Sequence, residues 1–146
     1  ANILSEDFGI QADVWSCPSF NELKRDGDDC VRWNLMHPEQ KPRIPHVTAC
    51  LEKHSGPVVA ATDYVKLFAD QIRAYVGRNF HVLGTDGFGR SDTRASLRRH
   101  FEVNRYYVTV AALKTLADEG TIPAKTVKSA IRKYKLDPEK PNPLHA

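Results

Sequence analysis

Residues 80–101 read FHVLGTDGFGRSDTRASLRRHF, and this stretch decides the fold. Phe80 to Gly84 is a short apolar run of the kind that a buried parallel strand uses. A glycine-rich turn follows it, and Asp92 to Phe101 then favours a helix in which Leu97 and Phe101 share one face. The order strand, turn, helix is typical of an α/β sheet.

The segment before it supplies the other half of the same unit. The run PVVAATD at residues 57–63 is short, apolar and bounded by turn residues, so it predicts another buried strand. Asp63 can cap a helix that ends at Gly77. Six apolar side chains share one face of that predicted helix, namely Tyr64, Leu67, Phe68, Ile72, Tyr75 and Val76. Strands that alternate with helices predict a mostly parallel sheet.

Less regular structure is expected between these strands and the N-terminal end. ADVWS at residues 12–16 alternates weakly and favours a strand. Five prolines lie between residues 18 and 57, and this density predicts only short helices, over 20–24 and 47–53. The stretch RDGDD at residues 25–29 lacks the spacing of a calcium loop, so a solvated acidic turn is favoured over a cation site.

The two ends of the chain are predicted to be helical. Residues 1–9, ANILSEDFG, resemble the last turns of a helix that ends at Gly9, and we therefore expect a piece of a longer chain. Further helices are expected over 104–120, capped by asparagine and ended by glycine, and over 123–136. The tail KPNPLHA at residues 140–146 has little to bury and is expected to run over the surface or fray.

The glycine-rich turn nearly matches a nucleotide-binding signature. Gly84 to Ser91 fits the phosphate loop Gly-x-x-x-x-Gly-Lys-Ser/Thr, except that Arg90 replaces the lysine. Asp86 also places an anion where anions would bind. We therefore favour a tight strand-to-helix turn in which Ser91 or Asp92 caps the helix and at least one glycine has a positive φ. The residues of this structural loop are Gly84, Asp86, Gly87, Gly89, Arg90, Ser91 and Asp92.

Composition and spacing exclude several classes of function. The net charge of +3 does not by itself indicate a nucleic-acid partner, and no apolar stretch is long enough to span a bilayer. The three cysteines form no zinc pattern and predict reduced, intracellular thiols. The six histidines show no metal-binding spacing; His100, beside two arginines, is expected at a surface or interface. A basic, solvated face is expected on the last helix, formed by Lys125, Lys128, Arg132, Lys133 and Lys135.

Longer strings in the chain carry a resemblance. VLGTDGFGRSDTR, together with ADVWSCPSFNELKRDG, RWNLMHP, AATDYVKLFADQIRAYV, RRHFEV and KPNPLHA, resembles the C-terminal region of the homodimeric bacterial pyruvate dehydrogenases. The similarity covers essentially all 146 residues. It implies that residues 1–146 are a transketolase-like C-terminal domain, three-layered and α/β, that lacks its first strand and belongs to a longer multidomain chain.

The resemblance also implies a function for the parent enzyme. Members of that family decarboxylate pyruvate on thiamine diphosphate with Mg²⁺ and reductively acetylate the lipoyl group of the acetyltransferase core. Their cofactor-binding residues lie in other domains, so no catalytic, cofactor-binding or metal-binding residue is expected here. The implied partners are the N-terminal and middle domains, the second subunit of a homodimer and the dihydrolipoyllysine acetyltransferase core, all in the cytoplasm. The alternative is a non-catalytic α/β module that binds an anion or a protein partner.

Overall fold

The computed structural model describes residues 1–145, and its centre is a two-stranded parallel sheet. Strand β1 (Val58–Ala61) pairs with β2 (Phe80–Leu83), with Val58 opposite Phe80 and Ala61 opposite Leu83. These are the two apolar runs in which the sequence predicted strands. Their parallel pairing confirms the α/β class.

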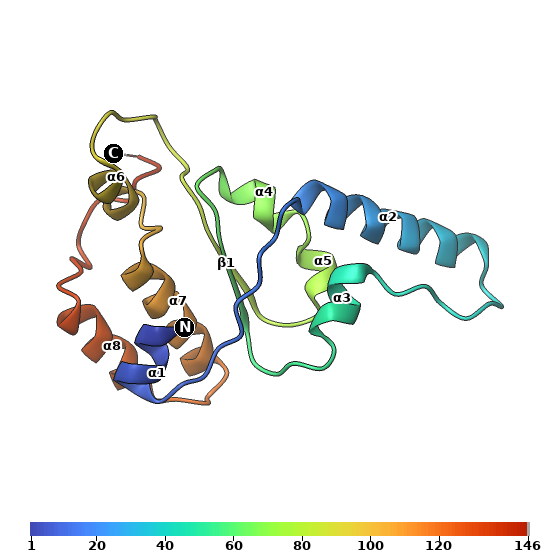
Figure 1. Ribbon diagram of the computed structural model, residues 1–146, viewed down its shortest axis with the longest axis horizontal. Coiled ribbons are helices and arrows are strands. Elements are labelled where there is room, and N and C mark those ends of the chain that lie inside the picture. Colours follow the sequence, from blue (N-terminus) through green and yellow to red (C-terminus); the bar gives the residue numbers. More distant parts are fainter. Residues whose placement is uncertain (146) are drawn as a thin grey trace.

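Helices cover both faces of the sheet and give three layers (Figure 1). One layer contains α2 (Phe20–Met36), α3 (His46–Leu51), α4 (Lys66–Asp70) and α5 (Arg73–Val76). The other contains α1 (Asn2–Phe8), α7 (Arg105–Asp118) and α8 (Ala124–Lys133), and α7 contacts both strands. Helix α6 (Arg94–His100) lies near the end of the molecule to which the carboxyl ends of the strands point (Figure 1).

Each outer layer has its own apolar core. The first lies between the strands and the helices α3 to α5, and its buried members are Val47, Ala69, Ile72, Tyr75, Val76, Phe80 and Val82. The second joins α1, α7 and α8 through Leu4, Leu113, Val127 and Ala130. Burial of such side chains is the main favourable term in folding, so the two cores fix the helices relative to the sheet.

Helix α2 corrects the sequence prediction most strongly. Its 17 residues run through a region where the proline count predicted only a short helix at 20–24. The prolines bracket the helix, because Pro18 precedes it and Pro38 follows it, with none between. Ser19 caps its start by accepting a hydrogen bond from Glu22 N at 3.2 Å.

Two further predictions about regular structure were wrong. The structure assigns no strand to residues 12–16; Asp13 instead bonds His54 Nδ1 at 2.8 Å, across the molecule. The helix expected up to Gly77 is divided into α4 and α5, and α4 begins after Val65 without a cap from Asp63. Ile72, at the division, lies in the core, whereas the earlier apolar residues of the predicted stripe are exposed.

The helices at the two ends are largely as predicted. Helix α1 ends at Gly9, which has a left-handed φ of 66°. The Asn104 side chain accepts hydrogen bonds from Tyr106 N and Tyr107 N and caps α7. Helix α8 follows Pro123 but ends at Lys133, three residues earlier than expected. No helix within residues 1–145 combines the length and apolarity needed to cross a bilayer.

Helices α1 and α8 are held together by a polar contact beside their shared core. Asp7 accepts a hydrogen bond from Tyr134 Oη at 2.7 Å and forms an ion pair with Lys133 Nζ at 2.6 Å. Phe8 packs edge-on against the Tyr134 ring, with centroids 6.4 Å apart. The hydrogen bonds from Lys133 and Tyr134 lower the pKa of Asp7.

This lowered pKa predicts a pH-dependent contribution of Asp7 to stability. A carboxyl group whose pKa is lower in the folded state stabilises the fold above its unfolded-state pKa of about 4 and loses that contribution at lower pH. The variant Asp7→Asn is therefore expected to unfold at lower urea concentration than wild type at pH 7. The difference should shrink as the pH falls below about 4.

The control for this prediction is Glu6→Gln, which neutralises the exposed neighbouring residue. Its urea midpoint should follow that of wild type at every pH. A wild-type-to-Asp7→Asn difference that stays constant from pH 7 to pH 3 would contradict the assignment.

Candidate functional site

The glycine-rich loop follows β2 directly and packs against the turn that follows β1. A Cβ atom on Gly84 would lie 2.6 Å from Tyr64 O and 2.7 Å from Lys66 N, closer than real contacts allow. Thr85 N donates to Tyr64 O at 2.9 Å, which continues the pairing beyond the two strands. Gly84 is therefore required because two backbones approach closely.

Asp86 uses its carboxylate within the fold. Its Oδ1 accepts a hydrogen bond from Lys66 N at 2.9 Å, and its Oδ2 lies 3.9 Å from Lys66 Nζ. Asp86 thus satisfies a free N–H group at the start of α4, the task that the sequence had assigned to Asp63. An acid in this position occupies the place of an anionic ligand.

The other glycines of the loop differ from one another. Gly87 has a φ of 107°, which confirms the prediction that at least one of them has a positive φ. Gly89 has neither a positive φ nor any atom within 4 Å of a Cβ. Nothing in the structure requires glycine at position 89.

The end of the loop differs from a phosphate loop. Helix α6 is capped by Thr93, whose Oγ1 accepts from Ser96 N at 3.3 Å, so neither Ser91 nor Asp92 is the cap. Asp92 Oδ1 instead accepts from Thr93 N at 2.6 Å. Arg90 and Ser91 both precede the helix and are exposed, whereas the phosphate-loop lysine and serine contact phosphates at a helix start.

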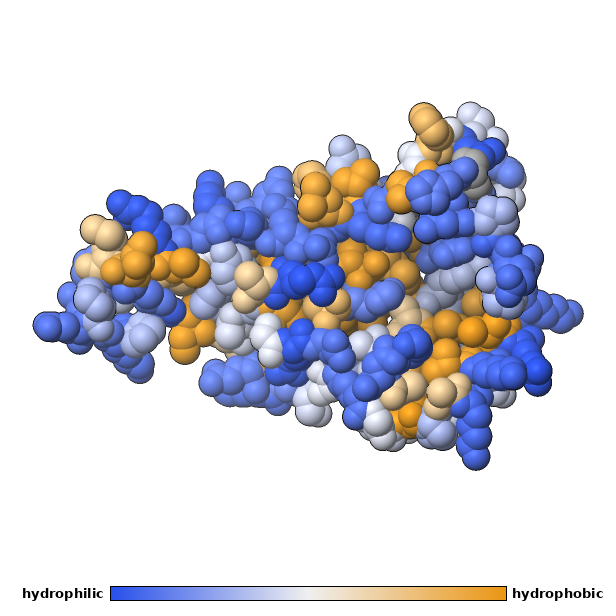
Figure 2. Space-filling model, turned by 180° about the vertical axis from the view of Figure 1, so that it is seen from behind, coloured by the Kyte–Doolittle hydropathy of each residue, from blue (hydrophilic) through white to orange (hydrophobic). Residues whose placement is uncertain are grey.

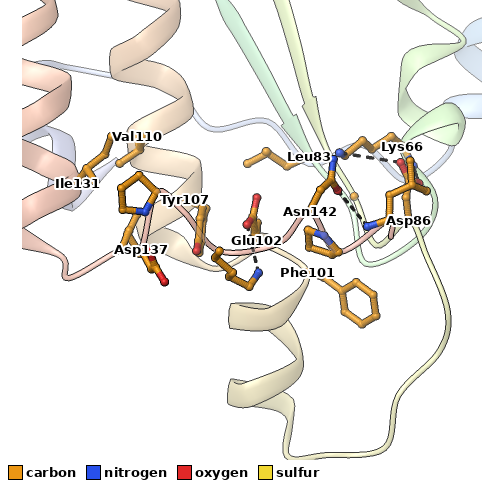
Figure 3. A pocket seen from close by; sticks show the side chains of 16 residues that line it. Lys66, Leu83, Asp86, Phe101, Glu102, Tyr107, Val110, Ile131, Asp137 and Asn142 are labelled. Carbon is orange, nitrogen blue, oxygen red and sulfur yellow. Dashed lines mark hydrogen bonds and ion pairs between the residues drawn. The ribbon is translucent and has the colours of Figure 1, made fainter. Parts of the chain in front are cut away.

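A cavity of about 320 Å³ lies beside this loop, at the carboxyl edge of the sheet (Figure 3). In α/β folds this edge is where ligands commonly bind. The apolar part of its lining includes Leu83, Phe101, Val110 and Ile131, and the polar part Lys66, Asp86, Glu102, Tyr107, Asp137, Lys140 and Asn142. The sequence did not predict this cavity, because its walls come from segments far apart in the chain.

The ionisable groups around the cavity are largely paired with one another. Lys140 Nζ bonds Glu102 Oε1 at 3.1 Å, and Lys66 lies beside Asp86. Burial, with the charges of Glu102 and Asp137, raises the pKa of the Tyr107 hydroxyl. These contacts hold segments together, and within residues 1–145 no cluster of three or more metal-binding side chains is found.

His100 is the last residue of α6 and was expected at a surface or interface. It is half-buried, and its Nε2 atom has no hydrogen-bond partner within the described chain. Burial, followed by the charges of Arg90 and Lys140, lowers its pKa. A second cavity of about 480 Å³ lies beside it, bordered by Arg90, Ser91, Asp92, Ser96, Leu97 and His100.

The remaining sequence candidates have structural roles. The acidic stretch 25–29 lies within α2 rather than in a turn. Asp28 binds Lys24 and the Tyr75 hydroxyl, while Asp26 Oδ2 accepts a hydrogen bond from His46 N at 2.6 Å. The basic residues of the last helix are exposed as predicted, and Lys133 is paired with Asp7.

The different environments of Gly84 and Gly89 predict unequal effects of the same substitution. Gly84→Ala must separate the backbones that follow β1 and β2, and we expect a loss of about 1–3 kcal/mol of unfolding free energy. Gly89→Ala is the matched control in the same loop and should change stability by less than about 0.5 kcal/mol. Chemical denaturation of both variants checks this; equal losses would contradict the close approach at Gly84.

Comparisons with known proteins agree with this fold. Residues 1–104 match the family model described as the transketolase-like TK C-terminal domain. The chain is 58% identical over 144 residues to the pyruvate dehydrogenase E1 component of Cupriavidus necator, and 59% identical over 145 residues to that of Pseudomonas aeruginosa. It is 53% identical over 144 residues to the protein of the same name from Escherichia coli K12.

These alignments cover nearly all of this chain but a small part of each relative. They include 98 to 99% of the chain, which spans 16% of the length of each of these relatives. The family model covers well over half of the chain, including both strands and the glycine-rich loop. The chain therefore belongs to the family of transketolase-like C-terminal domains.

Proposed function

We propose that this chain is the C-terminal domain of a pyruvate dehydrogenase E1 component and acts within the complete enzyme. The observation that carries the proposal is the 53 to 59% identity to proteins of that name over nearly every residue of the chain. The parent enzyme decarboxylates pyruvate on thiamine diphosphate with Mg²⁺ and reductively acetylates the lipoyl group of the acetyltransferase core. It works in the cytoplasm as a homodimer.

The role of this domain in the parent is structural. Three carboxylates, two of them beside the cavity, are engaged in the fold: Asp86 caps α4, Glu102 pairs with Lys140, and Asp28 pairs with Lys24. Thiamine diphosphate and Mg²⁺ would be bound by the other domains of the subunit. The domain contributes a rigid body against which those domains pack.

The surface of the domain supports such packing. Val31, Leu35, Met36 and Ile44 are 53 to 75% exposed, and we call this group the α2 patch. Figure 2 shows apolar side chains gathered at the narrow end of the molecule, over α2. Beside the patch, Asn34 exchanges hydrogen bonds with Arg43 at 2.7 and 3.0 Å, and Arg43 lies over the Trp33 ring, so α2 is tied to the segment that contains Ile44.

The α2 patch is proposed to contact the remaining domains of the same subunit. Exposed contiguous apolar surface marks interaction sites in soluble proteins. The curated relatives are far longer than this chain, which spans 16% of their length. The rest of such a polypeptide would provide a large surface for the patch to pack against. The acetyltransferase core and the second subunit then contact other surfaces of the parent.

Pyruvate turnover and cofactor binding test the proposed activity. The full-length parent is expected to decarboxylate pyruvate and to bind thiamine diphosphate with Mg²⁺ in calorimetric titration. The 146-residue chain alone should do neither, because the cofactor-binding domains are outside it. Micromolar binding of thiamine diphosphate to the isolated chain would contradict the structural role, and a parent without pyruvate turnover would contradict the activity.

A charge in the α2 patch tests the packing role. Leu35→Asp in the parent should weaken docking of this domain by about 2 kcal/mol or more, because a buried carboxylate would replace an apolar contact. Faster limited proteolysis between this domain and the rest of the subunit measures the effect. Gln40→Asp adds the same charge at a nearby exposed site and should leave the cleavage rate unchanged.

Analytical ultracentrifugation of the same variants identifies the partner of the patch. The Leu35→Asp parent should remain dimeric while its proteolysis accelerates. Dissociation of the dimer with an unchanged cleavage rate would show that the patch contacts the second subunit instead, and would overturn the assignment.

A further inference from the structure

The segment of residues 137–145, here called the strap, folds back over the carboxyl edge of the sheet. The tail from residue 140 was expected to have little to bury and to run over the surface or fray; within it, Pro143 is buried. In Figure 1 the C-terminal end lies beside α6 and the loop that leads into it. The strap therefore contacts a part of the chain about 50 residues earlier in the sequence.

One contact of the strap is with the glycine-rich loop. A Cβ on Gly87 would lie 2.4 Å from Pro143 O and 3.3 Å from Leu144 Cα. The loop backbone thus fits against the strap only because position 87 has no side chain. The positive φ of Gly87 and its contact with the strap are two independent reasons for glycine at this position.

A second contact involves Lys140, in the first half of the strap. Lys140 Nζ donates hydrogen bonds to His100 O at 2.5 Å and to Glu102 Oε1 at 3.1 Å. His100 is the last residue of α6 and Glu102 lies between α6 and α7, so Lys140 joins the strap to the C-terminal end of α6 and the segment after it. Near the contact with the loop the strap makes a turn, in which Leu144 N donates to Asn142 Oδ1 at 3.0 Å.

The strap forms one wall of the cavity at the carboxyl edge. Its share of the lining is Asp137, Pro138, Lys140, Asn142, Pro143 and Leu144. The opposite wall is formed by the end of β2 and by Tyr107 and Val110 of α7. Displacement of the strap would remove this wall and widen the cavity, and it would leave both cores in place, because neither core contains a strap residue.

We propose that residues 137–145 are a releasable strap whose release removes one wall of this cavity and widens it. Pro143 is the single buried residue among them, so release exposes little apolar surface. Segments with few buried contacts open at a lower free energy than the whole domain. The strap is docked when Gly87 contacts Pro143 and Lys140 binds His100 and Glu102. It is released as a unit when either contact is lost.

Hydrogen exchange followed by mass spectrometry tests the strap on the complete, assembled chain. In wild type, amides of residues 137–145 should exchange faster than those of β1 and β2, yet slower than an unfolded peptide. Gly87→Ala should accelerate exchange in the strap roughly 5- to 150-fold, the range expected for a strained backbone. Gly89→Ala, in the same loop with open space around it, is the matched control and should leave strap exchange unchanged.

Two further variants change the strap itself rather than the glycine-rich loop. Lys140→Met removes both hydrogen bonds without touching the glycine loop, and should accelerate strap exchange about tenfold or more. A chain that stops after Glu139 lacks Pro143, so adding Gly87→Ala to it should affect the loop less than it does in the full-length chain. This cycle separates the contact with the strap from the strain of the positive φ.

Three results would overturn the proposal. One is equal acceleration by Gly87→Ala and Gly89→Ala, and another is exchange that rises in β1 and β2 together with the strap. The third is an effect of Gly87→Ala that is the same with and without residues 140–146. Amide exchange is independent of pyruvate turnover, so these outcomes are distinguishable from a failure of the proposed activity.

Discussion

The close approach of two backbones at the carboxyl edge of the sheet is the constraint on which the rest of the structure depends. Gly84 lets the chain after β2 touch the chain between Tyr64 and Lys66. Backbone hydrogen bonds from Thr62 N to Leu83 O and from Thr85 N to Tyr64 O extend the pairing past the strands. The contact fixes where α4 begins and where the glycine loop leaves the sheet, and it brings Lys66 and Gly84 together in the lining of the cavity.

The two faces of the sheet bury different sets of apolar side chains. The helices on the two faces form separate cores, joined through the short strands between them. Helix α2 extends beyond this arrangement, so the side chains of the α2 patch have no core to enter within the described residues. An exposed apolar patch of this kind fits a domain that packs against other parts of a larger subunit.

The glycine-rich loop shows why a local motif did not reveal its own role. Its sequence nearly satisfies the phosphate-loop pattern, yet the pattern does not mark the residues that the fold uses, because nothing in the structure requires glycine at the matching position 89. Gly84 permits a backbone contact, Asp86 satisfies a helix N–H group, and Gly87 makes room for the strap. Spacing along the chain cannot distinguish these reasons, because all three partners lie at least 18 residues away from the loop in sequence.

The sequence by itself determined the features whose causes lie within a few residues. Both strands, the Asn104 cap of α7 and the left-handed Gly9 after α1 follow from local apolar runs and from capping chemistry. The tertiary structure alone decided that the predicted helix up to Gly77 divides at Ile72, that Asp86 caps α4 and that the strap docks. These features depend on contacts between distant segments, and burial of Ile72 or Pro143 has no signature until the sheet brings its partners together.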